Sequence, residues 1–501
     1  MTDNDVIALL TQGAALHPER KFDEAIAIYK RVLDAHPGNL DALTFLASAY
    51  RSLGRIGEAV ALHDRIAETN PDRADFWFNR GNALGDSGRH ADAAVAYQRS
   101  IELEPANAVV LANLAICHSK VGNAGEAIAC YERALEIDPD NKISLHNIGN
   151  LLADQGRLYE AAEYFRRTVR SWPELAEGHY NLSHILLRLG DFTAGFREYE
   201  WRWDTADFFE KPAYRDVPVW KGEKLDGKRL IVHSEQGLGD SIQFAKILGM
   251  LASLGGDIVF HVPKNLERLF KTMPFAVTVT GAHRASDADF QVALLSLPHR
   301  LKLTAGSVPA ASAFLTAEPA VATKWSSRLK LGSSRPSIGL VWQGNPNSPA
   351  ERGRSLPSAE TLAPFAALAG TRLIALQMLA AEDLEPADTP SGWRVRGLSF
   401  TLEHPGPDMD KGADSFADTA AIMAGIDQVV SVCTAPLHLA GALGRPSIAL
   451  LKAVPDWRWM MERTDTPWYP TMQLVRQQRG EDYGPVVDRA VEAVRRKLDN
   501  Q

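Results

Sequence analysis

The stretch Arg229–Ala245 (RLIVHSEQGLGDSIQFA) combines residue types that suit proton transfer beside a bound anion. Its apolar start predicts a short buried strand, and Gly237 and Gly239 predict a tight turn after it. Asp240 and Ser241 suit a helix start, because short side-chain oxygens accept bonds from its unpaired N–H groups. Such a turn directs N–H groups and the positive end of a helix dipole toward an anion. We predict a phosphate-bearing ligand here, with Asp240 as general base; the alternative is a plain turn that Asp240 caps.

Two other groups on the same turn are alternative bases. His233 and Glu235 lie just before the glycines, so either could replace Asp240. Farther along, Asp287 and Asp289 have the D-x-D spacing that can hold a divalent metal beside a phosphate. They precede an expected strand, however, and so lie at the sheet edge opposite the ligand. We therefore predict no metal site.

A second set of candidate residues follows strands in the last third of the chain. The loop after Trp342 contains Arg352 and Arg354, whose guanidinium groups offer forked donors to a diphosphate. Thr434 is placed to cap a helix that holds His438, which repeats the anion-suited turn. The alternatives are a solvated loop and a structural histidine. The residues that we expect around the phosphate-bearing ligand are Gly237, Gly239, Gln343, Asn345, Arg354, Asp418, Thr419, Cys433, Thr434, Ala435 and His438.

From Gly227 onward, expected strands alternate with expected helices. Alternation of this kind predicts parallel sheets with right-handed crossovers, which bind ligands beyond the carboxyl ends of their strands. Strands are expected at Arg229–His233, Ile258–Val262, Val277–Val279, Val292–Leu295, Ile338–Trp342, Arg372–Gln377, Gln428–Val432 and Ser447–Leu451. Helices are expected at Ser241–Ala252, Leu266–Lys271, Ala420–Gly425 and Asp488–Leu498.

The first two hundred residues repeat with a step of 34 residues. Prolines keep the step at Pro37, Pro71, Pro105, Pro139 and Pro173, and alanines keep it at Ala25, Ala59, Ala93, Ala127 and Ala161. Large residues keep it at Tyr29, His63, Tyr97, Tyr131 and Phe165, and small ones at Gly13, Ala47, Gly81, Ala115 and Gly149. The pattern resembles the tetratricopeptide repeat (TPR) family. Small residues then let paired helices approach, aromatics fill the space between hairpins, and prolines end the second helix. The concave groove of such a superhelix binds protein or peptide.

A sixth, altered unit covers about 179–203 and ends in YEWRW. Trp201 and Trp203 stand where a free array would carry a polar cap, so we expect this end to dock on the next domain. The 34-residue step also relates Asn79, Asn113, Asn147 and Asn181. Their amides suit a peptide backbone in the groove, and solvated helix surface is the alternative. Segment 204–226 is too aromatic for a flexible linker, so we expect a packed connector.

Length, charge, cysteine content and hydropathy indicate how many domains to expect and which classes of protein are disfavoured. A chain of 501 residues predicts about three domains. The formal charge of −8 argues against a general nucleic-acid binder. Cys117, Cys130 and Cys433 form no close pair, which favours a reducing cytoplasm. The start MTDNDVIALL lacks the pattern of a signal peptide, and no apolar run approaches the ~20 residues of a membrane span.

Two successive α/β halves, each with an anion-suited turn, resemble the two-lobed B-type glycosyltransferase fold. The segments EQGLGDSIQFA, LVWQGNP, RSLP, SFADTAAI, SVCTAPLHLAGALGRP and PDWRW are similar to those of bacterial TPR glycosyltransferases. Their catalytic half is similar to the ADP-heptose–lipopolysaccharide heptosyltransferase family. The predicted fold is an all-α TPR superhelix followed by two Rossmann-like domains. We expect the superhelix at 1–203, the connector at 204–226, an acceptor lobe at 227–320, a nucleotide-sugar lobe at 335–484 and a terminal helix at 485–501.

The resemblance also implies roles for single residues. The family's glycine–aspartate pair falls on Gly239 and Asp240, which makes Asp240 the implied general base. The family's phosphate-binding lysine falls on Arg354, which keeps the positive charge. The family's D-T-x-x-x-H turn falls on Cys433, Thr434 and His438. A cysteine thus replaces an aspartate, which removes a sugar or helix-capping contact and argues against a heptose donor. With no basic neighbour in sequence, this cysteine is not expected to be a nucleophile.

The implied activity is an inverting, metal-independent transfer from a nucleotide-sugar, with no cofactor. The favoured hypothesis is a protein acceptor, flagellin among them, presented by the repeat groove as in repeat-bearing O-linked N-acetylglucosamine transferases. One alternative is a lipid or polysaccharide acceptor, and another is an interaction scaffold with a degenerate transferase half. The nucleotide, the sugar class (hexosyl, heptosyl or nonulosonic), the acceptor and the oligomeric state stay open.

Overall fold

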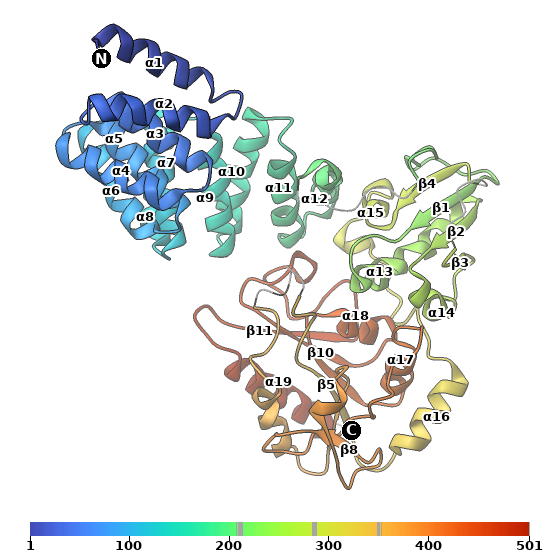
Figure 1. Ribbon diagram of the computed structural model, residues 1–501. Coiled ribbons are helices and arrows are strands. Elements are labelled where there is room, and N and C mark those ends of the chain that lie inside the picture. Colours follow the sequence, from blue (N-terminus) through green and yellow to red (C-terminus); the bar gives the residue numbers. More distant parts are fainter. Residues whose placement is uncertain (207, 209–213, 283–287, 348–350, 352, 500–501) are drawn as a thin grey trace. The chain divides into compact units, whose positions relative to one another are not determined.

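The computed structural model describes residues 1–206, 208, 214–282, 288–347, 351 and 353–499. It divides into two compact units, Met1–Gly178 and His179–Gln501. The first unit is all-α, and the second contains parallel sheets, so the predicted fold class is confirmed (Figure 1).

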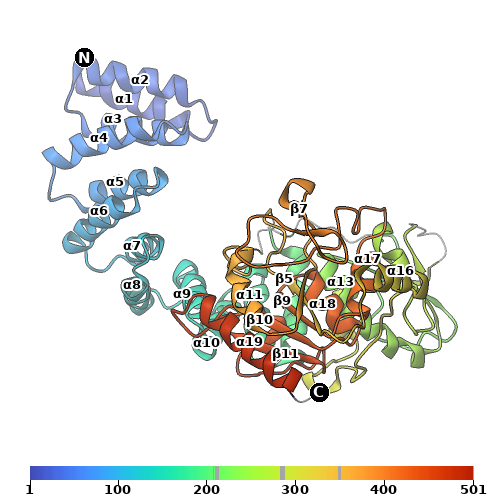
Figure 2. The ribbon, with the colours of Figure 1, turned by 90° about the horizontal axis from the view of Figure 1, so that it is seen from below.

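The first unit consists of helix pairs that follow one another along the chain (Figure 2). Its helices are α1 (Asp3–Ala15), α2 (Phe22–Ala35), α3 (Leu40–Ser52), α4 (Ile56–Thr69), α5 (Ala74–Asp86), α6 (His90–Leu103), α7 (Ala108–Lys120), α8 (Ala124–Ile137), α9 (Lys142–Asp154) and α10 (Leu158–Ser171). Each repeated proline lies just beyond the second helix of a pair, as predicted. The turn within a pair has a positive φ at Gly54, Gly88, Gly122 and Gly156, whereas Arg20 takes this conformation in the first pair.

Small residues on the first helix of a pair leave room for an aromatic side chain on the second. A Cβ atom added to Gly13 would lie 2.5 Å from the Tyr29 ring, and one added to Gly81 would lie 2.6 Å from the Tyr97 ring. Tyr29 also stacks on Phe45 of the next pair, with ring centroids 5.6 Å apart. The aromatic residues therefore join the two helices of one hairpin, and Tyr29 joins neighbouring hairpins as well.

Replacing Gly81 by alanine is expected to destabilise the array by about 1–3 kcal/mol, because the new methyl would overlap the Tyr97 ring. Gly85, one turn along the same helix, is the matched control, since a Cβ atom there would lie 3.9 Å from the Tyr97 hydroxyl. Gly85→Ala is expected to stabilise the helix by about 0.5 kcal/mol. Chemical denaturation followed by circular dichroism measures both. Equal effects of the two substitutions would contradict the packing described.

The sixth hairpin is part of the second unit rather than of the array. It comprises α11 (Ala176–Arg188), α12 (Phe192–Tyr199) and the 3-10 turn η1 (Glu200–Asp204), and the second unit starts at His179. Buried residues of the hairpin that share one hydrophobic core with the α/β region are Leu187, Phe192, Phe196 and Tyr199. The predicted docking is therefore confirmed, but these side chains make it. Trp201 and Trp203, on which the prediction rested, are only half-buried.

The described residues of the second unit form two parallel sheets and one small antiparallel hairpin. The first sheet has the order β3-β2-β1-β4, from β1 (Arg229–His233), β2 (Asp257–His261), β3 (Thr278–Thr280) and β4 (Phe290–Ala293). The second has the order β11-β10-β9-β5-β6, from β5 (Ser337–Val341), β6 (Arg372–Ala375), β9 (Gln428–Val432), β10 (Ser447–Leu451) and β11 (Met472–Arg476). Strands β7 (Leu384–Pro386) and β8 (Trp393–Val395) form the hairpin. The order reverses between β1 and β4 and between β5 and β9, where α/β sheets bind ligands.

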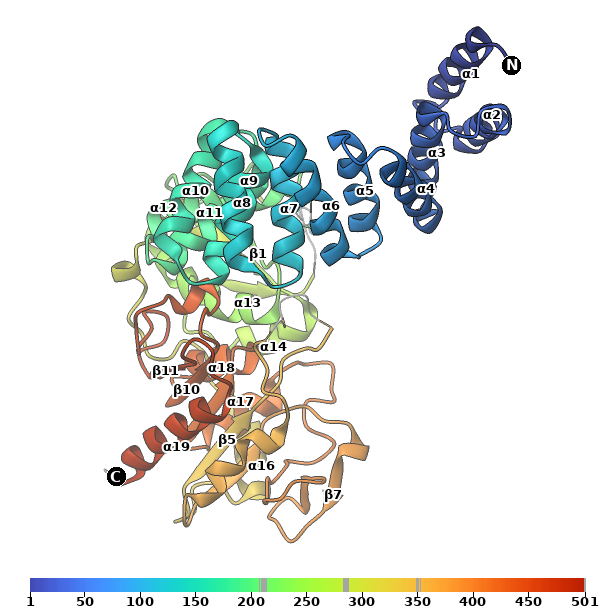
Figure 3. The same cartoon turned by 90° about the vertical axis from the view of Figure 1, so that its left-hand side faces the viewer.

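The remaining helices of the second unit cover the sheets and join them. They are α13 (Leu238–Ala245), η2 (Lys246–Leu254), η3 (Lys264–Leu266), α14 (Glu267–Phe270), η4 (Leu294–Ser296), α15 (Leu297–Arg300), η5 (Ala305–Ser307), α16 (Pro319–Leu329), η7 (Ala359–Ala367), η8 (Ala381–Asp383), α17 (Ala417–Ala424), α18 (Ala435–Ala442), η9 (Trp457–Trp459) and α19 (Gly484–Asp499). Helix α19 packs along β10 and β11 (Figure 3).

One continuous hydrophobic core spans both sheets of the second unit. Phe244 of α13 packs edge-on against Trp468, with ring centroids 5.2 Å apart. The buried Lys246 Nζ donates to the Trp468 carbonyl at 2.7 Å. In the connector, Trp220 is fully buried and its backbone N–H donates to the Gln291 carbonyl at 2.8 Å. The connector is thus packed where it is described; Phe209, another of its aromatic residues, lies outside the described residues. No helix among those described is long and apolar enough to cross a membrane.

Candidate active site

Helix α13 begins earlier than the sequence predicts. Its first residue is Leu238, with Gly237 as N-cap, and Asp240 occupies the third helical position instead of the cap. The Asp240 carboxylate reaches back to the cap residue and accepts the Gly237 N–H at 3.0 Å. Asp240 therefore does cap the helix, from inside its first turn.

The second oxygen of Asp240 is held across the two lobes by an arginine. Arg458 of η9 forms an ion pair with Asp240 Oδ1 through Nη2. The same guanidinium donates from Nη1 to Asp456 Oδ1 at 2.8 Å and lies over the Trp457 ring, 4.3 Å from its centroid. Burial opposes ionisation of Asp456, but Arg458 keeps the pKa of its carboxyl well below the usual value. The candidate base is thus one member of a partly buried carboxylate–guanidinium–carboxylate group.

The start of α18 faces the start of α13. A Cβ atom on Gly239 would lie 3.1 Å from His438 Cδ2 and 3.4 Å from Ala435 Cα, so only glycine lets the two helix starts approach this closely. Thr434 is the N-cap residue of α18, but its side chain makes no capping bond. Its hydroxyl instead donates to the Val432 carbonyl at 3.4 Å. The predicted side-chain cap is therefore wrong, although Thr434 does occupy the N-cap position of α18.

Arg354 lies near this meeting point. Its Nη2 is 3.5 Å from Glu351 Oε2, and its Nε is buried without a hydrogen-bond partner in the described part of the chain. Gly344 donates its N–H to Ser355 Oγ at 2.9 Å, which keeps the loop after β5 close to Arg354. The backbone N–H of Gln343 donates to the Gln377 side chain at 3.2 Å.

Asn345 Oδ1 accepts the Asn347 N–H at 3.0 Å and shapes the same loop. Its side chain therefore has a local structural role in this loop. Arg352, the other arginine predicted there, lies outside the described residues.

Cys433 and His438 are buried and uncharged. The Trp459 indole donates to Cys433 Sγ at 3.0 Å, and burial raises the pKa of the thiol to about 11. His438 Nδ1 lies 3.0 Å from the Tyr469 hydroxyl, its ring stacks on Trp459, and burial lowers its pKa to about 3. At neutral pH, Cys433 is a thiol that packs the site and His438 is a neutral imidazole. Both observations favour a packing role for Cys433.

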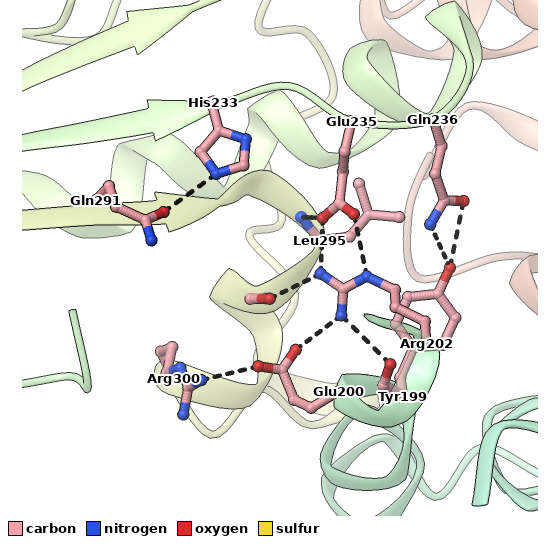
Figure 4. Close-up of polar contacts among 10 residues, drawn as sticks. Tyr199, Glu200, Arg202, His233, Glu235, Gln236, Gln291, Leu295 and Arg300 are labelled. Carbon is pink, nitrogen blue, oxygen red and sulfur yellow. Dashed lines mark hydrogen bonds and ion pairs between the residues drawn. The ribbon is translucent and has the colours of Figure 1, made fainter. Parts of the chain in front are cut away.

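Glu235 belongs to a structural ion pair, which removes it as a candidate base (Figure 4). Arg202 of η1 is fully buried and donates to the two carboxylate oxygens at 3.0 and 2.8 Å. Glu235 also accepts the Leu295 N–H at 3.0 Å. Burial raises the pKa of Glu235, and Arg202 opposes this rise. Arg202 also donates to Glu200 at 2.9 Å, to Ser296 at 2.8 Å and to the Tyr199 carbonyl at 3.3 Å, so this arginine ties the sixth hairpin to the loops after β1 and β4.

His233 is also unavailable as a base. It lies at the end of β1, only 3% exposed, with its Nε2 3.1 Å from Gln291 Oε1 on the neighbouring strand (Figure 4). Burial lowers its pKa to about 4. Of the three candidate bases, only Asp240 lies at the meeting point of α13 and α18.

Asp418 and Thr419 hold a loop together rather than face the helix starts. Asp418 accepts the Trp325 indole N–H at 2.6 Å and the Asp410 N–H at 2.9 Å. The Thr419 hydroxyl donates to Asp410 Oδ2. Both side chains are engaged in this local network.

The asparagines of the array are half-buried and join helices. Asn113 donates to Asn82 Oδ1 at 3.3 Å, and the Tyr97 hydroxyl donates to the same oxygen at 2.7 Å. Asn147 of α9 lies close to the Tyr131 hydroxyl of α8. Asn79 is half-buried on α5, and Asn181 lies on α11 in the second unit. At Asn113 and Asn147, packing between helices accounts for the side chain.

The D-x-D pair lies as the sequence predicts, as far as it is described. Asp289 precedes β4, and its carboxylate accepts the Arg229 N–H at 2.8 Å at the amino end of β1. Asp287 lies outside the described residues. No cluster of three or more His, Cys, Asp or Glu residues suited to a metal was found among the residues described.

The two arginines that organise this region were not singled out by sequence reasoning. Both are the middle residue of a Trp-Arg-Trp triplet, Arg202 between Trp201 and Trp203 and Arg458 between Trp457 and Trp459. An arginine between two tryptophans, with a carboxylate residue directly beside the triplet, is a signal for a buried guanidinium that stacks on an aromatic face.

Comparison with known protein families gives two kinds of match. The tetratricopeptide repeat family matches residues 16–77 and 86–148, and a second description of that repeat matches 60–108 and 146–206. Glycosyltransferase family 9 (heptosyltransferase) matches residues 412–482, which include Cys433, His438 and Arg458 but not Asp240. The chain therefore carries tetratricopeptide repeats and a segment of a glycosyltransferase family.

Single proteins match parts of the chain. Protein FlbA of Caulobacter vibrioides is 30% identical over 349 residues, which are 64% of this chain and 55% of that protein. The chain thus spans about half the length of this curated relative. A crystal structure of MamA covers 33% of this chain and 96% of its own, at 26% identity and a TM-score of 0.31. A thermophilic TPR protein of Thermus thermophilus covers 36% and 99%, at 19% identity and a TM-score of 0.30.

Proposed function

Because the chain joins tetratricopeptide repeats to a glycosyltransferase family 9 segment, we propose that it transfers a sugar from a nucleotide-sugar donor to a protein acceptor. The observation that carries the proposal is the meeting of two helix starts, α13 and α18, with Asp240, Arg354 and Arg458 around them. Helix N-termini and guanidinium groups suit a diphosphate, and a carboxylate beside them suits a general base.

The proposed reaction needs no metal or cofactor. The acceptor hydroxyl passes its proton to Asp240 while its oxygen forms a bond to the anomeric carbon, which inverts the configuration. The electron pair of the breaking C–O bond leaves with the nucleoside diphosphate, whose charge Arg354 and the helix N-termini stabilise. Cys433 replaces the aspartate of the resembling family, so we expect a donor sugar other than heptose.

The repeats supply the reason to propose a protein acceptor, since stacked hairpins form a groove suited to an extended peptide. Flagellin is one candidate acceptor. The three cysteines are all free and buried, and a cytoplasmic location is part of the proposal.

A thermal-shift screen of the full chain against ADP-, UDP-, GDP- and CMP-linked sugars tests this function. We expect one nucleotide class to raise the melting temperature and Arg354→Ala to abolish the rise. Arg335→Ala is the matched control, because Arg335 is exposed and precedes the amino end of β5, the strand whose carboxyl end carries the Arg354 loop. A folded protein that responds to no donor would contradict the proposal and favour an interaction scaffold.

A further inference from the structure

Arg458 joins the two lobes at the candidate base. It comes from the segment after β10 in the second sheet, whereas Asp240 follows β1 in the first. The side chains of Arg458 and Asp240 are 10% and 18% exposed, so water screens their ion pair only partly. Asp456, the other partner of Arg458, is 30% exposed on its side chain and lies on the same segment as the arginine.

The same guanidinium lies within electrostatic reach of the expected phosphate position. Arg354 and Arg458 both lower the pKa of Cys433 and His438, although burial has the larger effect on each of these groups. Because Cys433 and His438 flank the start of α18, both arginines act on this helix start. Arg458 therefore contacts the candidate base directly and acts electrostatically on the residues that flank the anion-suited helix start.

The charges around the start of α18 limit what can bind there. Among the described residues, the guanidinium groups of Arg354 and Arg458 stand beside the carboxylates of Glu351, Asp240 and Asp456. Both guanidinium groups are already paired, so a diphosphate must compete with a carboxylate for them. The pair between Arg458 and Asp240 is the one that spans two lobes, and its loss leaves Arg458 anchored by Asp456 and by the Trp457 ring.

We propose that the donor diphosphate replaces the Asp240 carboxylate as the ion-pair partner of Arg458. This exchange leaves the carboxylate free to accept the proton of the acceptor hydroxyl. The inference rests on the proposed function and adds to it an order of events. In the structure, the Asp240 carboxylate is paired with the Arg458 guanidinium, which holds one of its two oxygens. With the diphosphate bound, Arg458 stabilises the leaving group, and Asp240 faces the acceptor without its counter-charge.

The exchange predicts that removing the charge of Asp240 strengthens anion binding. Asp240→Asn retains an oxygen for the Gly237 N–H and releases Arg458, so we expect pyrophosphate, ADP, UDP or GDP to bind about tenfold more tightly than to the unchanged chain. Arg458→Gln is expected to weaken the same binding at least tenfold. In the Arg458→Gln background, Asp240→Asn is expected to change affinity by less than about twofold, because the two residues act as one unit.

Isothermal titration calorimetry of the full chain with these four probes measures the affinities. Asp408→Asn is the matched control, since Asp408 is paired with Arg328 at 2.6 Å on the outer helix α16, and we expect no change in affinity. If Arg458→Gln fails to fold, Arg458→Lys replaces it in the experiment. Lysine keeps the positive charge but lacks the two parallel N–H donors of the guanidinium, so we expect an affinity between those of the unchanged chain and of a neutral variant.

The outcomes separate the inference from the proposed function. Equal or weaker binding to Asp240→Asn would overturn the exchange while leaving a diphosphate-binding transferase in place. Probe affinity that is unchanged by substitution of Asp240 or Arg458 but lowered by Arg354→Ala would also overturn the exchange and leave a diphosphate-binding transferase in place. No binding of any probe to any folded form would contradict the exchange and the transferase function together.

Discussion

A chain that begins at Thr205 is expected not to fold, whereas one that begins at Ala176 is expected to form the complete second unit. The first deletion removes Phe192 and Phe196 from the shared core and leaves Glu235 without Arg202. Loss of one partner of a buried ion pair alone costs about 3–5 kcal/mol, and each large apolar side chain adds about 1.5–3 kcal/mol. These losses are as large as the ~5–15 kcal/mol that keeps a typical domain folded.

Circular dichroism and size-exclusion chromatography of the two truncated chains distinguish these outcomes. A cooperative thermal transition in the chain from Thr205 would show that the sixth hairpin is dispensable. In the full chain, the loss of stability caused by Arg202→Met measures the contribution of the ion pair without removing the hairpin. Combining Arg202→Met with Glu235→Leu should recover part of the lost stability, because replacing both members of a buried pair removes the unpaired charge.

Replacing Asp240 by asparagine is expected to lower the rate of sugar transfer by about 10²–10⁴-fold, because the amide cannot accept the acceptor proton. Stability should fall only slightly: the ion pair with Arg458 is lost, but the amide oxygen still accepts the Gly237 N–H and Arg458 keeps Asp456 as a partner. The measurement is transfer of a labelled sugar from the donor that the thermal-shift screen identifies, with melting temperature recorded in parallel.

Asp289→Asn is the matched control for transfer, because Asp289 lies at the opposite edge of the same sheet. We expect its transfer rate to stay within about twofold of the unchanged chain. Full transfer by the Asp240 variant would show that another group removes the proton and that Asp240 serves only as a cap and as a partner of Arg458.

Local sequence patterns predicted the helices and strands whose formation depends on residues that are close together in the sequence. The 34-residue step fixed the helix pairs of the array, and unbroken apolar runs located β1, β9 and β10 with their observed bounds. Strand β11 and the β7–β8 hairpin were not predicted. β7 and β8 have only three residues each, too few for a clear period of two.

The candidate site was predictable only in part, because its key contacts join distant segments. The glycine turn and Asp240 were recognised, since their chemistry is carried by neighbouring residues. Their partner Arg458 is 218 residues away in sequence, and the pair of Arg202 with Glu235 spans 33 residues. Repeating patterns of residue types along the sequence do not reveal contacts between segments that are this far apart. The same limit explains the two bases wrongly considered: His233 and Glu235 share a turn with Asp240, but strand β4 and the sixth hairpin bury them.

The sixth hairpin belongs to the second unit, and this limits which repeats can be gained or lost during evolution. Up to Gly178, a copy of the 34-residue repeat can be gained or lost by recombination, because each hairpin packs chiefly on its neighbours. Helix α12 and η1 cannot be exchanged in this way, since Arg202 and Tyr199 have partners outside the array. Natural variation in repeat number should therefore be confined to the region before His179, where it alters the length of the repeat array.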